Sequence, residues 1–346
     1  MSRFRRVENV LRGGCGKHFT AAVARIEHRG KVVFERAYGA TRDDAPARDV
    51  YVDSIFDLAS LTKLFVATLA LRLVAQHRLQ LDAPLGGEIA QWRDGEHAAI
   101  TLRMLLAHIS GMNSGADYRA ILDENVERFA LCSDLIAEPG ERVVYSDLGF
   151  IALGALLERT AGASLANLAA GAFAPPLRFR PGAAQRAAIP ATEEDEWRGR
   201  VQGFVHDEKC YLMGGVAGHA GLFGTASDVA ALAESYLGAV NGRNGALLPP
   251  SLAREAISEQ AYDPVLRRGL GWALKTNDEN SCGRLMDSSS FGHTGFVGTC
   301  VWADPLRDLQ GVLLTNAVYF GRNAPSPPGP PLRSSFYEAM VEDAQA

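Results

Sequence analysis

Four consecutive residues, Ser60-Leu61-Thr62-Lys63, place a hydroxyl and an amine three positions apart at the start of a long apolar segment. Residues with this spacing lie on the same face of a helix, so the amine of Lys63 could reach the oxygen of Ser60. A serine hydroxyl becomes a good nucleophile when a base removes its proton, and a lysine in apolar surroundings can act as that base. The motif therefore indicates nucleophilic catalysis, although a pattern this short also arises by chance.

Two later motifs could supply the other parts of such a site. A nucleophilic serine needs a group that carries its proton to the leaving group, donors for the developing oxyanion and a surface for the substrate. Tyr145-Ser146-Asp147 follows a turn and precedes a helical pattern, so a loop could present it to a cleft. His293-Thr294-Gly295 comes before a strand pattern that starts at Phe296, and a glycine there lets a substrate or another backbone approach closely. Taken singly, each motif is also explained by packing at a helix start or by a bend.

The order and spacing of the three motifs resemble those of the penicillin-recognising serine hydrolases. This family contains class C β-lactamases, DD-peptidases and β-lactamase-like esterases. The likeness covers residues 20–340, and no serine lies in the G-x-S-x-G pattern of α/β-hydrolases. The matching segments are FDLASLTKLFVATLALRLV (56–74), TLRMLLAHISGM (101–112), VVYSDLGFIALGALLE (143–158), VHDEKCYLMGGVAGHAGLFGTASDVA (205–230, similar to one branch of the family) and FGHTGFVGTCVWADP (291–305).

The resemblance implies a catalytic role for three residues. Ser60 would attack an ester or amide carbonyl and become acylated, and Lys63 would activate it. Tyr145 would exchange protons with the nucleophile, the leaving group and later the hydrolytic water.

The resemblance also implies how the substrate is held. Thr294, together with His293, would lie along the substrate at the sheet edge. The oxyanion donors would be the backbone N–H groups of Ser60 and Phe296. A helix N-terminus has unpaired N–H groups and favours negative charge, which fits a donor at Ser60.

Two positions depart from the commoner pattern of that family. The second motif often ends in Asn but here ends in Asp147, and an ionised carboxylate near Lys63 would favour the protonated lysine. Proton transfer would then move toward Tyr145, and the sequence leaves open which of these two residues is the main base. The third motif usually begins with Lys, whereas His293 is charged only if its pKa is raised. The loss of a constant cation puts penicillin-like substrates in doubt and favours uncharged esters.

Three further histidines receive less weight as functional residues. His108 is interpreted as a structural histidine at a helix end. His206 and His219 lie near Asp207, and a His–Asp pair could indicate a metal or a second acid–base pair, but the spacing fits no common metal site. We therefore expect neither a metal nor a cofactor.

These residues together predict a cofactor-free serine hydrolase that forms an acyl-enzyme at Ser60. A carboxylesterase acting on small acyl esters is the first choice, and a β-lactamase, D-amino-acid amidase or DD-peptidase is the alternative. A protein of another class, which binds or senses a ligand without turnover, stays open because Asp147 and His293 alter the charge of the site.

The elements that must position these residues follow from hydrophobic periodicity and turn signals. Strand patterns near both ends of the chain, with helical patterns between them, predict one antiparallel sheet built from both termini and flanked by helices. The predicted elements are a hairpin over 20–39, a buried helix over 60–76, helices over 101–108 and 150–160 and from Thr225, strands over 269–274, 296–303 and 310–318, a Pro-rich segment over 324–331 and a helix over 333–344.

This arrangement is an α/β fold of the α+β type, and the resemblance implies the β-lactamase/transpeptidase-like form of it. We expect a discontinuous sheet domain formed by residues 1–80 and 200–346. Residues 81–199 would form a mostly helical domain, and the active site would lie in the cleft between the two.

Composition bounds the possible partners and location. With 346 residues, 47% of them hydrophobic and 22% charged, the chain has the composition of an ordinary globular protein. The net charge of −5 and the lack of a basic cluster argue against a nucleic-acid partner. The most apolar run is interrupted by Lys63 and Arg72, which does not suit a membrane span, and no signal peptide is evident. We expect a cytoplasmic protein with a small ester or amide substrate, although a trimmed chain would look the same, and the oligomeric state stays unknown.

Overall fold

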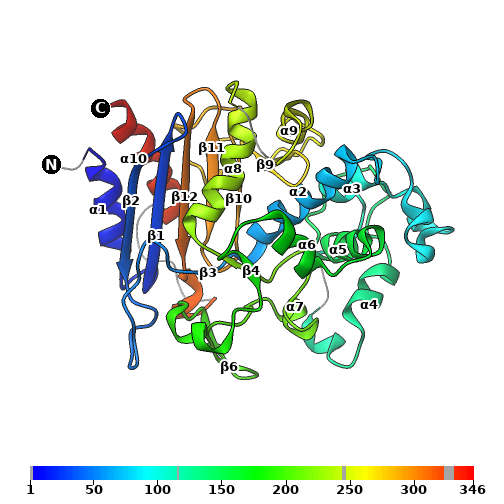
Figure 1. Cartoon of the computed structure of the whole chain (residues 1–346), viewed down its shortest axis with the longest axis horizontal. Coiled ribbons are helices and arrows are strands. Elements are labelled where there is room, and N and C mark those ends of the chain that lie inside the picture. Colours follow the sequence, from blue (N-terminus) through cyan, green and yellow to red (C-terminus); the bar gives the residue numbers. More distant parts are fainter. Residues whose placement is uncertain (1–2, 115–116, 244–246, 323–330) are drawn as a thin grey trace.

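The computed structural model describes residues 3–114, 117–243, 247–322 and 331–346. Its largest layer is a seven-stranded antiparallel sheet (Figure 1). In chain order the strands are β1 (Ala21–His28), β2 (Lys31–Gly39), β8 (Arg267–Arg268), β9 (Ala273–Leu274), β10 (Phe291–Thr294), β11 (Cys300–Asp304) and β12 (Leu309–Thr315). Their order in the sheet is β2-β1-β12-β11-β10-β9-β8, so the first hairpin pairs with the last strand. The predicted sheet built from both termini is confirmed.

Helices cover both faces of this sheet (Figure 1). Successive residues of a strand point to opposite faces. Val312 and Leu314 of β12 accordingly join the core that contains α8 (Ala226–Val240), whereas Leu309 and Leu313 join the core formed with the two terminal helices. Because both faces are covered, every residue of β12 is buried.

The terminal helices α1 (Arg5–Gly14) and α10 (Leu332–Gln345) pack together on the face away from α8. The sequence predicts α10 but not α1. The backbone N–H groups of Arg6 and Val7 donate to Oδ2 of the buried Asp343 at 2.8 and 3.1 Å. A carboxylate at a helix N-terminus satisfies free donors and is stabilised by the helix dipole, so this contact joins the two ends of the chain.

The predicted buried helix is α2 (Thr62–Ala75), which follows a 3-10 turn over Ala59–Leu61. Apolar residues surround it because the sheet and α8 lie on one side and other helices lie on the other (Figure 1). The remaining α-helices of the described residues are α3 (Leu102–Leu106), α4 (Val126–Cys132), α5 (Asp147–Ala161), α6 (Leu165–Ala172), α7 (Glu208–Leu212) and α9 (Pro250–Ala256).

The predicted start of α8 is also confirmed, because Thr225 and Asp228 form a reciprocal capping box.

None of the described helices is by itself long and apolar enough to cross a membrane. Among the described residues, one pair of consecutive helices, α5 and α6, reaches the required length and apolar composition when the two are taken together, but they are bent by 77° relative to each other.

Two small sheets complete the described structure. One joins β3 (Phe56–Asp57), β7 (Leu222–Gly224) and β4 (Arg178–Phe179), and the other is a hairpin of β5 (Glu193–Asp195) and β6 (Gly199–Val201). This hairpin spans the predicted domain boundary at residue 200. The division into two domains stays a prediction.

Several predicted element bounds are wrong. The strand predicted over 296–303 begins only at Cys300, because β10 ends at Thr294 and a turn lies between the two strands. The run over 269–274 is a tight connection from β8 into β9, in which Gly271 has φ +83°. Beyond β12, a 3-10 helix begins at Ala317 inside the predicted strand 310–318. The Pro-rich segment lies, apart from Pro331, outside the described residues.

Candidate active site

Ser60 lies in the 3-10 turn directly before α2, and the residue before it has an unusual backbone conformation. Ala59 has φ +46°, a left-handed value that costs energy for a residue with a side chain. Its N–H donates to Oδ1 of Asp57 at 2.8 Å, and Oδ2 of the same carboxylate accepts the N–H of His206 at 2.7 Å. Burial raises the pKa of Asp57. These two bonds hold the turn that presents Ser60.

The side chain of Lys63 is completely buried and uses all three of its donors. Its Nζ donates to Ser60 Oγ at 3.1 Å, to Asp147 Oδ1 at 2.8 Å and to the backbone oxygen of His219 at 3.1 Å. The contact with Ser60 is the one that the spacing predicts. Burial lowers the pKa of Lys63, but the charge of Asp147 and the proximity of Tyr145 outweigh it and raise the pKa above its usual value. With its pKa raised in this way, Lys63 is a protonated ammonium group in the folded protein.

The ring of Tyr145 lies among two cations and two histidines. Lys63 Nζ is 4.9 Å from the ring centroid, and the guanidinium carbon of Arg268 is 5.4 Å from it. The ring centroids of His108 and His293 lie 4.6 and 6.1 Å from that of Tyr145. Cations at such distances are attracted by the ring quadrupole, so Tyr145 lies between two charged groups that come from different elements.

His108 contacts the segment that carries Tyr145. Its Nδ1 accepts the N–H of Ser146 at 3.1 Å, and burial lowers its pKa well below the usual value. Ser146 in turn caps α5, because its Oγ accepts the N–H of Gly149 at 2.8 Å. The interpretation of His108 as a structural histidine agrees with these contacts, which position Tyr145.

A chain of ion pairs extends from Lys63 into the 205–230 segment. Asp147 Oδ2 lies 3.3 Å from Lys209 Nζ, which lies 3.8 Å from Asp207 Oδ2. Asp207 Oδ1 lies 2.7 Å from His219 Nε2. Burial raises the pKa of Asp147, but the charge of Lys63 outweighs it and leaves the pKa below its usual value. The carboxylates of this chain are therefore ionised and balanced by ammonium groups.

Among the described residues, the ligand atoms of Asp147, Asp207 and His219 lie within 4.8 Å of one another, close enough to hold a metal. The oxygens of the two carboxylates already face Lys63, Lys209 and His219 at bonding or ion-pair distances. A metal would have to displace these partners, so the cluster is best described as an ion-pair network.

His293 and Thr294 end strand β10 on the other side of Tyr145. Nδ1 of His293 lies 2.8 Å from the carbonyl oxygen of Thr294 and must carry the proton, which leaves Nε2 as a buried acceptor without a partner among the described residues. Burial, and then the charges of Lys63 and Arg268, lower the pKa of His293 to about 3. His293 is therefore neutral and supplies no positive charge to the site from β10.

Gly295 allows β10 to approach the turn that carries Ser60. A Cβ at this position would lie 2.1 Å from Thr299 Oγ1 and 2.8 Å from the backbone oxygen of Leu58. Thr299 Oγ1 donates to that same oxygen at 3.1 Å. The close backbone approach expected at this glycine is therefore present, and it fixes the end of β10 against the residues before Ser60.

A pocket of about 530 Å³ opens over these residues. Lys63 and Asp147 lie outside its lining, whereas the other predicted site residues form its wall. Its lining includes Ser60, Tyr145, Arg268, Glu279, His293, Thr294, Gly295, the exposed Phe296 and Arg333.

The model of the Beta-lactamase family matches residues 7–328 of this chain. The chain belongs to the β-lactamase family. It is 29% identical to the N-acetylmuramyl-L-alanine amidase of Bacillus subtilis over 91% of this chain and 81% of that protein. It is also 29% identical to esterase EstB of Burkholderia gladioli, with 89% of each protein covered. The solved structure of EstCE1, a hydrolase with promiscuous acyltransferase activity, aligns with a TM-score of 0.76 and 21% identity over 98% of both chains.

Members of the β-lactamase family are serine hydrolases, and this protein is one of them. Four residues of this serine hydrolase's site have no counterpart in the sequence-based expectations: Asp57, Lys209, Arg268 and Arg333. Lys209 lies in the segment 205–230, whose similarity to one branch of the family could have indicated that Lys209 belongs to the site. Nothing in the local sequence singles out Arg268, which directly precedes the run over 269–274 that is predicted to be a strand.

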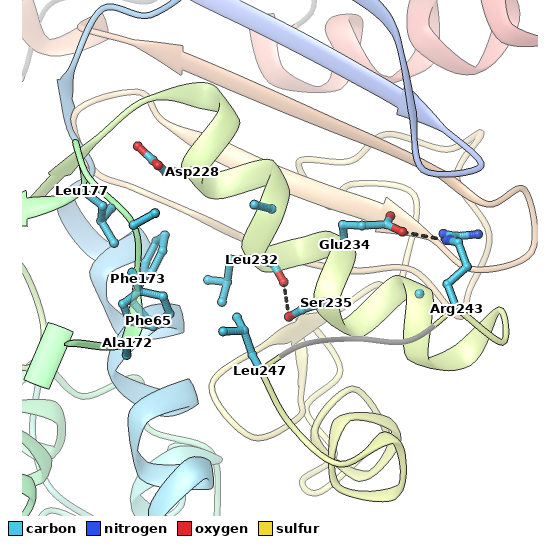
Figure 2. Close-up of a pocket in the computed structure, with 13 residues that line it drawn as sticks. Phe65, Ala172, Phe173, Leu177, Asp228, Leu232, Glu234, Ser235, Arg243 and Leu247 are labelled. Carbon is cyan, nitrogen blue, oxygen red and sulfur yellow. Dashed lines mark hydrogen bonds and ion pairs between the residues drawn. The ribbon is translucent and has the colours of Figure 1, made fainter. Parts of the chain in front are cut away.

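A second pocket of about 310 Å³ lies between α2, α8 and the segment after α6 (Figure 2). Phe65, Phe173 and Leu232 give it an apolar wall. Its serine, Ser235, donates to the backbone oxygen of Leu232 at 2.7 Å. None of the described residues that line this pocket is a lysine or a histidine, so Ser235 lacks the activating group that Ser60 has.

Proposed function

We propose that the protein hydrolyses small acyl esters through an acyl-enzyme formed on Ser60. The observation that carries the proposal is the contact of Ser60 Oγ with the buried Lys63 ammonium beside Tyr145, at the wall of the pocket. The esterase among the relatives supports an ester as the substrate.

In this mechanism Tyr145 relays protons and Lys63 supplies charge. Lys63 already donates three hydrogen bonds as an ammonium, so it has no lone pair with which to accept the serine proton. Ser60 Oγ attacks the carbonyl carbon, and in one concerted relay its proton passes to the Tyr145 oxygen while Tyr145 passes its own hydroxyl proton to the ester oxygen of the leaving alcohol. In deacylation water attacks the acyl carbon, its proton passes through the Tyr145 hydroxyl back to Ser60 Oγ in the same way, and the acid is released.

The developing oxyanion would be held by the backbone N–H groups of Ser60 and Phe296. The strained turn at Ala59 and the close approach of Gly295 support this assignment, because they fix both donors before the substrate arrives. Thr294, on the pocket wall, would lie along the substrate.

The test is ester turnover and intact mass of the wild type and Ser60→Ala with 4-nitrophenyl butyrate. We expect a butyryl adduct in the wild type and a loss of turnover of about 10³-fold or more in the variant. Ser235→Ala, which changes the serine of the second pocket, is the matched control and should keep wild-type turnover. Full activity in Ser60→Ala would overturn the mechanism.

The same protein should also be offered a labelled penicillin and a D-amino-acid amide. Turnover of either through Ser60 would favour the β-lactamase, amidase or DD-peptidase alternative, to which the amidase relative lends support. Stable penicillin labelling without any turnover would favour a sensor.

The proposal also includes a cytoplasmic location and an active site in the cleft between two domains.

A further inference from the structure

Arg268, on the short strand β8, is a buried cation that has no counter-ion in the part of the chain that the structure describes. It is only 8% exposed. Among the described residues, no carboxylate lies within ion-pair distance of its guanidinium, its side chain makes no hydrogen bond, and its buried Nε is unpartnered. Buried charged side chains are usually paired, as Arg198 is: its Nη2 lies 2.6 Å from a carboxylate oxygen of Asp195.

The unpaired guanidinium faces the pocket that contains Ser60. Arg268 lines this pocket together with Ser60, Tyr145 and His293. Its guanidinium carbon lies 5.4 Å from the Tyr145 ring centroid, which holds the side chain against the pocket wall. Burial lowers the pKa of Arg268, yet an arginine stays charged at any physiological pH.

Among the described residues, no acidic side chain of the pocket lining neutralises this charge. Glu279, the acidic residue of the lining, is exposed and forms no ion pair with Arg268. Asp263 acts on Arg268 only at a distance, and its Oδ1 accepts the N–H groups of Val265 and Leu266. The lining therefore has an excess of positive charge.

The second cation of the lining, Arg333, is already engaged. Its Nη2 donates to the backbone oxygen of Gly295 at 2.6 Å and lies 3.4 Å from that of Thr299. Arg333 thus supports the turn after β10, whereas Arg268 has its planar set of donors free. Such a guanidinium binds a carboxylate through two parallel hydrogen bonds.

We propose that Arg268 binds a carboxylate of the substrate, so that this pocket selects esters that carry an acid group over neutral esters. This proposal rests on the proposed ester hydrolysis at Ser60. It reverses the expectation of uncharged esters, which followed from the missing cation at His293. The positive charge is supplied from β8 instead of β10.

The test compares two matched pairs of esters. Mono(4-nitrophenyl) glutarate and 4-nitrophenyl butyrate differ by a carboxylate on the acyl part, and 4-acetoxybenzoate and its methyl ester differ by one on the leaving part. We expect the wild type to prefer the acid in at least one pair by about tenfold or more in kcat/KM, and Arg268→Gln to abolish that preference. The pair that responds tells which part of the substrate reaches Arg268.

Arg267→Gln is the matched control, because it removes an equal charge from the adjacent residue, which pairs with Glu259. It should keep the wild-type ratio between the members of each pair. Equal rates for acid and neutral esters in the wild type, or an unchanged ratio in Arg268→Gln, would overturn the proposal while leaving hydrolysis at Ser60 intact.

Glutarate binding separates this proposal from the proposed function and from a folding defect. Calorimetry on the wild type should show binding of glutarate but not of glutaramide, and glutarate should compete with butyrate ester hydrolysis. The calorimetric measurement needs neither turnover nor a variant. Equal binding of the two compounds, or of neither, would contradict a carboxylate site at Arg268.

Discussion

Tyr145 separates two buried cations whose surroundings differ completely. On the side of the 205–230 segment, Lys63 donates to Ser60, Asp147 and a backbone oxygen. On the side of the sheet, Arg268 has neither a carboxylate nor a hydrogen-bond acceptor among the described residues. Lys63 Nζ and the guanidinium carbon of Arg268 lie 4.9 and 5.4 Å from the ring centroid, so the main difference lies in what else the two cations contact.

The contrast separates two tasks within one pocket. A buried charge is costly unless it is paired, so the Lys63 side is electrostatically complete before any substrate binds. The Arg268 side becomes complete only when a ligand brings a negative charge. We infer that the first side serves the chemistry of every substrate and that the second side selects among them.

The largest expected effect comes from Lys63→Met, which keeps the length of the side chain and removes its charge. We expect kcat/KM to fall about 10³-fold, and by the same factor for acid and neutral esters, because the contribution of Lys63 does not depend on the substrate. The measurement is the ester panel described above. The exposed Lys31→Met is the control, and a loss confined to one class of ester would break the comparison between the two sides.

A smaller effect is expected from Asp147→Asn, which leaves the Lys63 ammonium without its closest carboxylate. Because the folded-state pKa of Lys63 is raised, the pair stabilises the protein fully below the ordinary lysine pKa and loses this effect as the pH rises above it. At pH 7 we expect a loss of about 3 kcal/mol in the free energy of unfolding, measured with urea.

Two further variants make the Asp147 experiment specific. The exposed Asp94→Asn should change the free energy of unfolding by less than about 0.5 kcal/mol. The double variant Lys63→Met, Asp147→Asn should recover part of the loss, because neither charge is then left alone. Strictly additive losses would show that the pair is not coupled.

The smallest effect concerns His293, which burial and then the charges of the two cations keep neutral. Its folded-state pKa of about 3 lies below the ordinary histidine value, so the unfolded chain takes up a proton below about pH 6.5 that the folded protein refuses. Stability contributed by this group is therefore present above pH 6.5 and is lost as the pH falls, by about 1.4 kcal/mol per pH unit and about 2 kcal/mol by pH 5.

His293→Asn should remove this part of the acid destabilisation. The measurement is the free energy of unfolding in urea at pH 7, 6 and 5. The exposed His77→Asn, at a left-handed position that asparagine tolerates, should keep the wild-type slope. An unchanged slope in His293→Asn would show that His293 is charged in the folded protein and that the sheet side is less cationic than described.

The features that depend on residues close together in the sequence were predicted from local patterns. The contact between Ser60 and Lys63 follows from helical spacing, the cap of α8 follows from Thr225 and Asp228, and the first hairpin lies within the predicted range 20–39. The resemblance to the family then supplied the roles of the site residues and the β-lactamase/transpeptidase-like form of the fold.

What failed depends on contacts between distant segments. The start of strand β11 was misplaced because the turn after Gly295 exists only where β10 meets the residues before Ser60. The role of Arg268 could not be predicted, since the sequence around it shows neither its burial nor the absence of a partner. Unpaired charge is a property of the folded surroundings, which no local pattern records.

The place of β1 between β2 and β12 has a consequence for how the chain is made. During synthesis β1 can at first pair only with β2, because its other partner, β12, and the helix that carries Asp343 lie far along the chain and emerge much later. Closing so long a loop is entropically costly, which makes the sheet slow to complete. The hairpin of β1 and β2 therefore keeps one edge unpaired until β12 has been synthesised, and the turn of Ser60 can be fixed against β10 only after β10 and Thr299 have left the ribosome.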